Sequence, residues 1–378
     1  MKTRAAVLRE MGPPAPYVES TPLVATDLTL DPPGEDEILV RVRAAGLCHS
    51  DLSVINGSRP RVMPMALGHE AAGEVVTTGS ADSSFEAGDH VVLAFVPACG
   101  ECRFCVEGRP ALCRPGGKAN AAGTLLNGEI RQRDESGTPI CHHLGVSAFS
   151  EHIVVSEHSA VKVPEDLPFD IAALFGCAVL TGAGMVLNTA ADALPARSIA
   201  VFGLGGVGLS ALLAAASQGP ETLIAVDPVA TKRQLALELG AGAAVDPGEG
   251  DAVEQVKAAA GGAGVDLAVE TAGSEVVLAQ AYEATGLGGT TVTAGLPHPD
   301  RMLQIQATSL TAEERTLKGS YLGSCVPSRD IPRFIGMYRA GNLPVDRLLS
   351  EHLRPDQLNE GFDRLAGAET VRQVVIFD

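Results

Sequence analysis

The sequence has few basic residues, no long apolar run and only eight cysteines, and each shortage excludes a class of protein. Lysine and arginine number 28 against 46 aspartates and glutamates, which gives a net charge of −18 at pH 7. Such a surface repels DNA and anionic lipid, so we expect no nucleic-acid partner and no membrane partner. No run is apolar for long enough to span a bilayer, and the N-terminal residues lack the apolar core of a secretory signal. We therefore expect a cytoplasmic location.

Half of the cysteines are concentrated in one short stretch with the spacing C-x2-C-x2-C-x7-C. They are Cys99, Cys102, Cys105 and Cys113. Structural disulfides are rare in a reducing cytoplasm, so thiolates at this spacing indicate a bound metal. A zinc ion and an iron–sulfur cluster both accept four thiolates. Cys141 and Cys325 lie apart from the cluster, and we interpret both as ordinary thiols.

The length of 378 residues exceeds what one compact core usually holds, so we predict two domains. Up to about residue 180, short runs of alternating apolar and polar residues, such as 37–48, predict many short strands. From residue 198 onward, apolar strands alternate with helical segments, which predicts a parallel sheet with crossover helices. The polar segment 116–146 has the character of a long loop, and loops of that length usually have a function or form an interface.

A glycine-rich turn links the first strand of the second half to a long helix. Gly203, Gly205 and Gly208 form G-x-G-x-x-G, and Asp227 ends the next strand. In this setting the motif predicts a dinucleotide site, with the pyrophosphate at the helix N-terminus and the carboxylate on the adenosine ribose. An acidic residue here favours NAD over NADP. The alternative is a structural turn followed by an incidental aspartate.

Three further residues offer a nitrogen and two sulfurs. Cys48, His69 and Cys177 form a ligand set that suits a catalytic zinc with an open fourth position. Their spacing alone does not establish that they meet, and a lone Cys or His is more often buried filler than a ligand.

The motifs together resemble the zinc-containing alcohol dehydrogenases of the medium-chain dehydrogenase/reductase family over essentially the whole chain. They occur in family order: GLCHSD (46–51), GHE (68–70), the four-cysteine cluster, GCAVLTG (176–182), GLGGVG (203–208) with Asp227, and VRQVVIFD (371–378). The resemblance implies an α/β plus β fold. A GroES-like catalytic domain would comprise residues 1–178 and 323–378, and a Rossmann NAD-binding domain residues 179–322, with the active site in the cleft.

The resemblance also implies a role for individual residues. The catalytic zinc would be held by Cys48, His69 and Cys177, and a structural zinc by Cys99, Cys102, Cys105 and Cys113, which makes two zinc ions per subunit. The cofactor would be bound by Gly203, Gly205, Gly206, Val207, Gly208, Asp227, Lys232, His49, Thr181, Leu296 and Arg372. Ser50 would relay the alcohol proton, and Ser53 stands where many relatives carry a terminal histidine base. Asp51 and Glu70 would stand behind the zinc ligands, with Phe95 and Arg59 in the substrate pocket.

The implied reaction is reversible hydride transfer between a primary or aryl alcohol and NAD. A thiol-dependent formaldehyde dehydrogenase shares nearly all of these motifs, and Arg59 is the feature that would suit its anionic substrate. A non-catalytic NAD-binding protein on the same fold, and an enzyme that never releases its NAD, are two further alternatives. The length of segment 116–146 favours a dimer over a tetramer.

Overall fold

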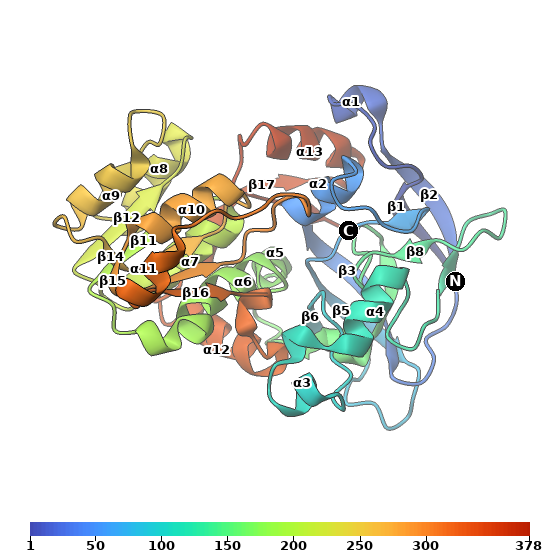
Figure 1. The fold of residues 1–378 in the computed structure, drawn as a ribbon. Coiled ribbons are helices and arrows are strands. Elements are labelled where there is room, and N and C mark those ends of the chain that lie inside the picture. Colours follow the sequence, from blue (N-terminus) through green and yellow to red (C-terminus); the bar gives the residue numbers. More distant parts are fainter. The chain divides into compact units, whose positions relative to one another are not determined.

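A computed structural model describes residues 1–378, and the chain divides into two compact units (Figure 1). Unit 1 contains residues 1–177, 326–332 and 349–378, and unit 2 contains residues 178–325 and 333–348. The boundary between residues 332 and 333 falls within α12 (Pro327–Arg339). No helix is both long enough and apolar enough to cross a membrane.

Unit 1 is built on two mainly antiparallel sheets. One has five strands in the order β7-β2-β1-β4-β8, and the other has seven, ordered β10-β6-β5-β3-β18-β17 with β9 also paired to β3. The strands are β1 (Lys2–Leu8), β2 (Leu23–Leu30), β3 (Glu37–Gly46), β4 (Met65–Ala66), β5 (Ala71–Thr78), β6 (His90–Leu93), β7 (Gln132–Arg133), β8 (Cys141–His142), β9 (His152–Ser156), β10 (Ala160–Lys162), β17 (Leu349–Leu353) and β18 (Arg372–Ile376). The expectation of many short strands in this half is confirmed.

Unit 1 also contains six short helices. They are α1 (Tyr17–Ser20), α2 (His49–Ile55), α3 (Arg103–Val106), α4 (Arg114–Ala122), α5 (Phe169–Leu174) and α13 (Leu358–Ala366). Helix α13 shows why such a segment folds here: Leu358, Phe362 and Leu365 recur at helical spacing and are all buried. These side chains join the apolar core formed by the inner faces of β1, β3 and β5.

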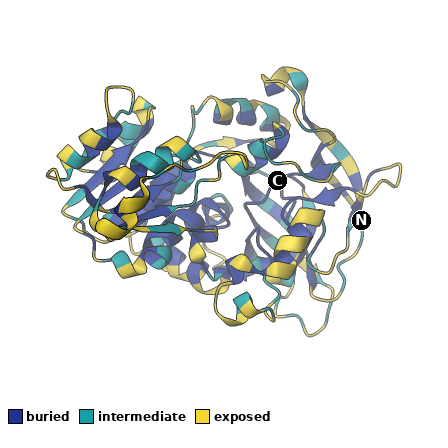
Figure 2. Cartoon of the chain, viewed as in Figure 1, coloured by how far each residue is buried: buried dark blue, intermediate teal, exposed yellow.

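Unit 2 is a six-stranded parallel sheet with helices packed against it. The strands are β11 (Ser198–Phe202), β12 (Thr222–Val226), β13 (Ala243–Val245), β14 (Val265–Glu270), β15 (Thr285–Thr293) and β16 (Thr316–Gly319). The helices are α6 (Ala178–Gly184), α7 (Gly206–Ala216), α8 (Ala230–Glu238), α9 (Ala252–Ala259), α10 (Glu275–Ala284) and α11 (Ala307–Ala312). Figure 2 shows the middle strands in the colour of buried residues, as expected when helices cover a parallel sheet.

The strand order of unit 2 is β13-β12-β11-β14-β15-β16, and every pairing is parallel. In chain order this is third, second, first, fourth, fifth, sixth, which is the Rossmann arrangement. The order reverses between β11 and β14. Ligands of such sheets bind beyond the carboxyl ends of the strands at that reversal, which is where the glycine turn follows β11.

Two sequence-based expectations need correction. Segment 116–146 is not one long loop, because it contains most of α4 together with β7 and β8. The end of the chain also does not belong to unit 1 alone, since residues 323–325 and 333–348 lie in unit 2. Two hydrogen bonds hold the latter segment there: Arg333 Nη1 donates to Asn188 Oδ1 at 3.0 Å, and Arg347 Nη1 donates to the Glu238 carbonyl at 3.3 Å.

Candidate metal and cofactor sites

The structure brings together Cys48, His69 and Cys177, which lie far apart in the sequence. Cys48 follows β3 and stands at the N-cap of α2, and His69 lies between β4 and β5. Cys177 immediately precedes α6. The two sulfurs and one ring nitrogen lie within 4.8 Å of one another, and all three residues are buried.

The carboxylate of Asp51 orients the imidazole of His69. Nδ1 of His69 lies 3.0 Å from Asp51 Oδ2, and both side chains are almost fully buried. The other ring nitrogen, Nε2, is buried and has no hydrogen-bond partner. A buried polar atom without a partner is costly, so Nε2 fits the role of a metal ligand beside the two sulfurs. This is the arrangement in which a carboxylate fixes the ring of a metal-binding histidine.

The two thiols and the imidazole shift one another's pKa values, and Cys48 is the group that favours the charged thiolate form. The Cys177 thiol hydrogen-bonds the Cys48 sulfur and, together with the charge of His69, holds the pKa of Cys48 well below its usual value. That hydrogen bond and burial raise the pKa of Cys177. Burial lowers the pKa of His69, but the charges of Asp51 and Cys48 outweigh it and raise that pKa. A thiolate and a carboxylate in one buried site match a dication such as zinc.

Glu70 and Arg372 form a buried ion pair beside this site. The two side chains are 0% and 4% exposed. Burial would lower the pKa of Arg372, but the charges of Glu70 and the two cysteines raise it above its usual value. The structure therefore places Arg372 against Glu70 within unit 1, and its expected contact with the cofactor pyrophosphate stays a prediction.

Ser50, the predicted relay residue, lies in the first turn of α2 and is partly exposed. His49 precedes it and is exposed, and its expected contact with the cofactor stays a prediction. Ser53 stands where relatives carry a terminal base, and its hydroxyl donates to the carbonyl of His49 at 2.8 Å. The Ser53 hydroxyl thus donates its hydrogen to a backbone carbonyl of its own helix, so this side chain does not replace the missing histidine base.

The two predicted pocket residues differ in how closely they approach His69. The rings of Phe95 and His69 meet edge to face with centroids 5.5 Å apart, so the aromatic side chain borders the metal site. Arg59 is partly exposed, and its backbone N–H donates to the Ser53 carbonyl at the end of α2. Its role toward a substrate stays a prediction.

The four-cysteine cluster converges in the segment around α3. The ligand atoms of Cys99, Cys102, Cys105 and Cys113 lie within 4.8 Å of one another. The Cys105 sulfur is 3.6 Å from that of Cys102 and 4.0 Å from that of Cys99, close to the roughly 3.8 Å expected for tetrahedral Zn–S bonds of about 2.3 Å. Backbone N–H groups point at the sulfurs, and that of Cys105 lowers the pKa of Cys102 to about 6. The cluster therefore fits one shared ion.

The glycine turn after β11 gives each glycine a different task. Gly203 has φ +87°, a conformation that favours glycine. A Cβ on Gly208 would lie 1.8 Å from the Gly203 carbonyl oxygen, so only glycine lets helix and strand approach this closely. A Cβ on Gly205 would meet nothing within 4 Å, and no side chain caps the helix that begins with Gly206 and Val207. Open space before free N–H groups fits a phosphate-bearing cofactor.

Asp227 is tied to this turn by both carboxylate oxygens. Leu204 N donates to Oδ2 at 2.7 Å, and Val229 N donates to Oδ1 at 2.8 Å. Each oxygen keeps a second lone pair, which a ribose hydroxyl can use. Lys232 lies near this carboxylate and is only 8% exposed, and burial lowers its pKa. It is therefore not a solvated surface lysine.

The remaining cofactor residues predicted in unit 2 differ in how far they are exposed to solvent. Thr181 lies in α6 and is 8% exposed, whereas Leu296 follows β15 and is 51% exposed. Val207 lies in the first turn of α7 and is partly exposed. Their contacts with a nicotinamide stay predictions.

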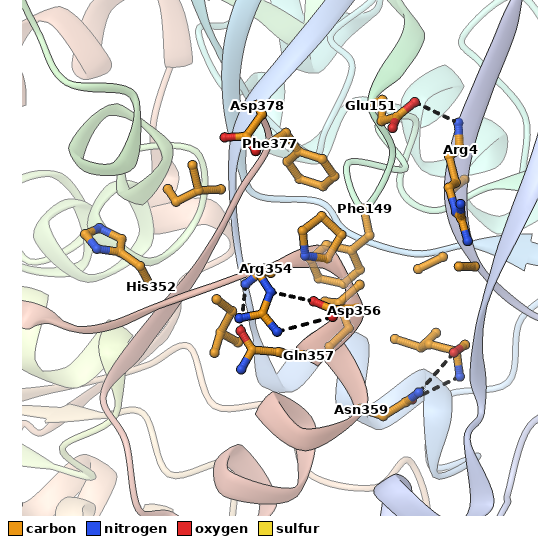
Figure 3. Close-up of a pocket in the computed structure, with 18 residues that line it drawn as sticks. Arg4, Phe149, Glu151, His352, Arg354, Asp356, Gln357, Asn359, Phe377 and Asp378 are labelled. Carbon is orange, nitrogen blue, oxygen red and sulfur yellow. Dashed lines mark hydrogen bonds and ion pairs between the residues drawn. The ribbon is translucent and has the colours of Figure 1, made fainter.

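Unit 1 also contains a cavity of ≈ 910 Å³ that no predicted site residue lines. Figure 3 shows the apolar rings of Phe149 and Phe377 together with the ion pair of Arg354 and Asp356. Its walls come from β1, β2, residues 149–151 and the two segments 352–359 and 376–378. The cavity is thus separate from the metal-ligand residues.

Family models match most of the chain. The alcohol dehydrogenase GroES-like domain matches residues 34–165, and the zinc-binding dehydrogenase domain matches residues 206–339. The chain belongs to the zinc-containing medium-chain alcohol dehydrogenase family. The GroES-like and Rossmann folds expected for a zinc alcohol dehydrogenase are confirmed.

Curated alcohol dehydrogenase relatives align over the full chain. Geraniol dehydrogenase from Castellaniella defragrans is 38% identical over 100% of this chain and 98% of its own. NDMA-dependent alcohol dehydrogenase from Amycolatopsis methanolica is 37% identical over 100% and 99%. S-(hydroxymethyl)glutathione dehydrogenase from Paracoccus denitrificans is 32% identical over 100% of both chains. These relatives differ in substrate, so membership of the family does not fix the substrate.

Solved structures of alcohol dehydrogenases have the same fold. An alcohol dehydrogenase zinc-binding domain protein from Burkholderia ambifaria superposes with a TM-score of 0.93 at 36% identity, covering 100% of this chain and 99% of its own. Benzyl alcohol dehydrogenase from Acinetobacter calcoaceticus gives 0.92 at 31% identity, with 100% of both chains covered. The fold is therefore shared along the entire chain.

One residue at the metal site escaped the sequence-based prediction. His143 Nδ1 lies 3.0 Å from Asp51 Oδ1, and its ring contacts that of His69. The only sequence signal is the His–His pair in CHHLGV, and its distance along the chain from GHE says nothing about contact.

Proposed function

We propose that the protein is a zinc-dependent alcohol dehydrogenase that transfers a hydride reversibly between a primary alcohol and NAD. The observation that carries this proposal is the buried convergence of Cys48, His69 and Cys177, with His69 Nε2 left without a protein partner. In this proposal unit 1 is the catalytic domain and unit 2 the NAD-binding domain. The four-cysteine cluster holds a second, structural zinc, because four thiolates close the coordination shell.

In this proposal the residues around the metal have three separate roles: binding zinc, orienting a ligand and transferring the proton. When bound by Cys48, His69 and Cys177, zinc supplies Lewis-acid stabilisation of negative charge on the substrate oxygen. Asp51 keeps the His69 ring turned so that Nε2 is the free ligand atom. Ser50 accepts the alcohol proton and passes it on, with water completing the transfer because Ser53 is bonded to the helix.

The glycine turn and Asp227 support NAD as the hydride acceptor. NAD, when bound, accepts the hydride at its nicotinamide ring. The N–H groups at the start of α7 bind its pyrophosphate, and the open space beside Gly205 admits the phosphates. Asp227 accepts ribose hydroxyls and repels the additional 2′-phosphate of NADP.

A flat, apolar substrate is favoured next to the metal. Phe95 presents its ring beside His69 and is only 8% exposed. Two relatives are named for geraniol and benzyl alcohol, both primary alcohols whose carbinol carbon adjoins an unsaturated carbon. We therefore propose primary aryl and allylic alcohols as the substrate class.

Oxidation of a thiol adduct of formaldehyde is the second candidate. It is favoured by the relative named S-(hydroxymethyl)glutathione dehydrogenase, at 32% identity, and by Arg59 as a cation for an anionic substrate. The identities of 37–38% to alcohol dehydrogenases place it second.

One assay separates these proposals. Reduction of NAD is followed by absorbance with benzyl alcohol in one series and with formaldehyde plus glutathione in another, and Cys177→Ser is the matched control. We expect turnover of benzyl alcohol that Cys177→Ser abolishes. Turnover with formaldehyde and glutathione alone would make the second candidate the function. Bound zinc without turnover of any alcohol or aldehyde would indicate a non-catalytic protein.

A third series with NDMA tests whether the cofactor is retained between turnovers, since one relative is named NDMA-dependent. Activity with NDMA and without added NAD, together with nicotinamide released on denaturation, would show a resident cofactor.

The eight free cysteines fit the proposed cytoplasmic location, because that compartment keeps thiols reduced. The dimer stays a prediction, and light scattering of the purified protein measures it.

A further inference from the structure

His143 contacts the carboxylate that holds His69, although it lies outside every motif that pointed to the site. It is 1% exposed, and its Nδ1 lies 3.0 Å from Asp51 Oδ1. The two imidazole rings pack edge to face, with centroids 5.5 Å apart and planes at 85°. The backbone N–H of His143 donates to Ser147 Oγ at 2.9 Å, which fixes the start of the turn that carries the ring.

Asp51 has a nitrogen facing each carboxylate oxygen, and these nitrogens come from separate segments. Oδ2 lies 3.0 Å from His69 Nδ1, while Oδ1 accepts from Gly68 N at 3.0 Å and lies 3.0 Å from His143 Nδ1. Asp51 is fully buried, so water does not replace a lost donor, and an unsatisfied buried acceptor costs about 1–3 kcal/mol. Without His143, Oδ1 keeps only the donor of Gly68, which is the chain neighbour of His69. The Asp51 carboxylate then has no contact with a segment distant from His69 to fix its orientation.

Asp51, His69 and His143 offer a second group of ligand atoms, since one atom of each lies within 4.8 Å of the others. Two observations favour hydrogen bonding instead. Both Nδ1–O separations are 3.0 Å, and, against the effect of burial, the two imidazoles help to hold the pKa of Asp51 below its usual value, as ring nitrogens that face a carboxylate do. The Gly68 N–H also points at Oδ1, where a cation would repel it.

We infer that His143 is a positioning residue of the zinc site, which holds Asp51 so that His69 keeps Nε2 available to the metal shared with Cys48 and Cys177. This inference rests on the proposed zinc function. Partners behind a metal ligand typically change metal affinity or activity ten- to 100-fold when they are removed. Since His143 acts through Asp51, its effect belongs to metal retention and ligand geometry.

The test compares His143→Leu with His143→Asn in the purified zinc-loaded enzyme. Leucine fills the space without a donor, whereas the asparagine amide nitrogen occupies nearly the position of Nδ1 and can still donate to Asp51. Zinc release to a chromogenic chelator is followed over time, and the visible spectrum of the cobalt-substituted protein reports ligand geometry. We expect His143→Leu to release one of two zinc ions about ten- to 100-fold faster and to alter the cobalt spectrum. His143→Asn should stay within about threefold of the wild type, and the four-cysteine zinc serves as an internal control.

Unchanged zinc release from His143→Leu, or release from His143→Asn as fast as from His143→Leu, would overturn the inference. If His143→Leu does not fold, His143→Gln replaces it, because a glutamine amide reaches the position of Nε2 and not that of Nδ1. The proposed function has a separate readout. A wild-type protein that binds only one zinc, unaffected by Cys177→Ser, would overturn the zinc function and this inference together.

Discussion

Two glycines in the turn between β11 and α7 should respond to alanine in opposite ways. A Cβ on Gly208 would lie 1.8 Å from the Gly203 carbonyl oxygen and 2.6 Å from Thr271 Oγ1, and the first of these atoms is backbone that cannot rotate away. A Cβ on Gly205 would meet no protein atom within 4 Å, and its φ of −75° is one that alanine adopts without strain. Gly208→Ala therefore tests the fold, and Gly205→Ala tests the cofactor space.

The magnitudes follow from these contacts. Overpacking against fixed backbone costs about 3 kcal/mol, the upper part of the usual range, which lowers the Tm of a unit of this size by about 6–12 °C. Gly205→Ala changes only an N-cap preference, so it should cost less than about 1 kcal/mol. The methyl group it adds occupies space that a pyrophosphate would need. Loss of one charge-assisted hydrogen bond, about 1.5–3 kcal/mol, weakens NAD binding about ten- to 150-fold.

Calorimetry measures both effects on the same preparations. Scanning calorimetry gives Tm, and titration calorimetry gives the Kd for NAD, which suits a chain without tryptophan. We expect Gly205→Ala to keep the wild-type Tm within about 4 °C while losing NAD affinity. Wild-type NAD affinity in Gly205→Ala would refute the placement of the pyrophosphate. An unchanged Tm in Gly208→Ala would refute the close packing of helix and strand.

Three further predictions follow from the site geometry. Cys177→Ser should reduce bound zinc from two to one per chain and abolish turnover with little change in Tm; metal analysis showing two zinc ions would contradict the ligand assignment. Asp227→Gly should raise the kcat/KM ratio of NADP to NAD while lowering Tm, because Leu204 N loses its acceptor; an unchanged ratio would remove Asp227 from the cofactor site. Burial lowers the pKa of His142 to about 3. The unfolded state then binds the extra proton below about pH 6.5, so stability falls with acidification. Between pH 7 and 5 the wild type should lose about 2 kcal/mol more than His142→Gln in urea unfolding; equal losses would show that His142 does not titrate as stated.

Motif spacing predicted the Rossmann half more completely than the metal site. The run from β11 through the glycine turn to Asp227 is continuous in sequence, and local chain geometry sets its contacts. The motif requires a tight turn, room for a pyrophosphate and close helix–strand packing. Gly203, Gly205 and Gly208 show in turn a positive φ, open space and a close approach. Local patterns of this kind can be interpreted without knowing how distant segments meet.

The thiol–imidazole site depended on resemblance, because its residues belong to separate segments of unit 1. Nothing in the spacing of Cys48, His69 and Cys177 requires them to meet. His143 was missed for the same reason: its contact with Asp51 arises from the fold and leaves no periodic signal. Arg372 shows the converse, since a motif match suggested a ligand contact and the structure adds a buried carboxylate, Glu70, as its neighbour.

Unit 1 is built from segments that are separated in the sequence, so it cannot be completed until the last segment has been synthesised. Glu70 and Arg372 are 302 positions apart, and β18 joins β17 to β3 in the seven-stranded sheet. Ribosomes deliver β3 early and β18 last, while the segment 178–325 emerges between them and pairs its own strands. We expect a nascent chain stalled before β18 to load zinc at the four-cysteine cluster and to lose it readily from Cys48, His69 and Cys177. Equal retention of both ions in such a stalled chain would show that the late strand is not needed to close the site.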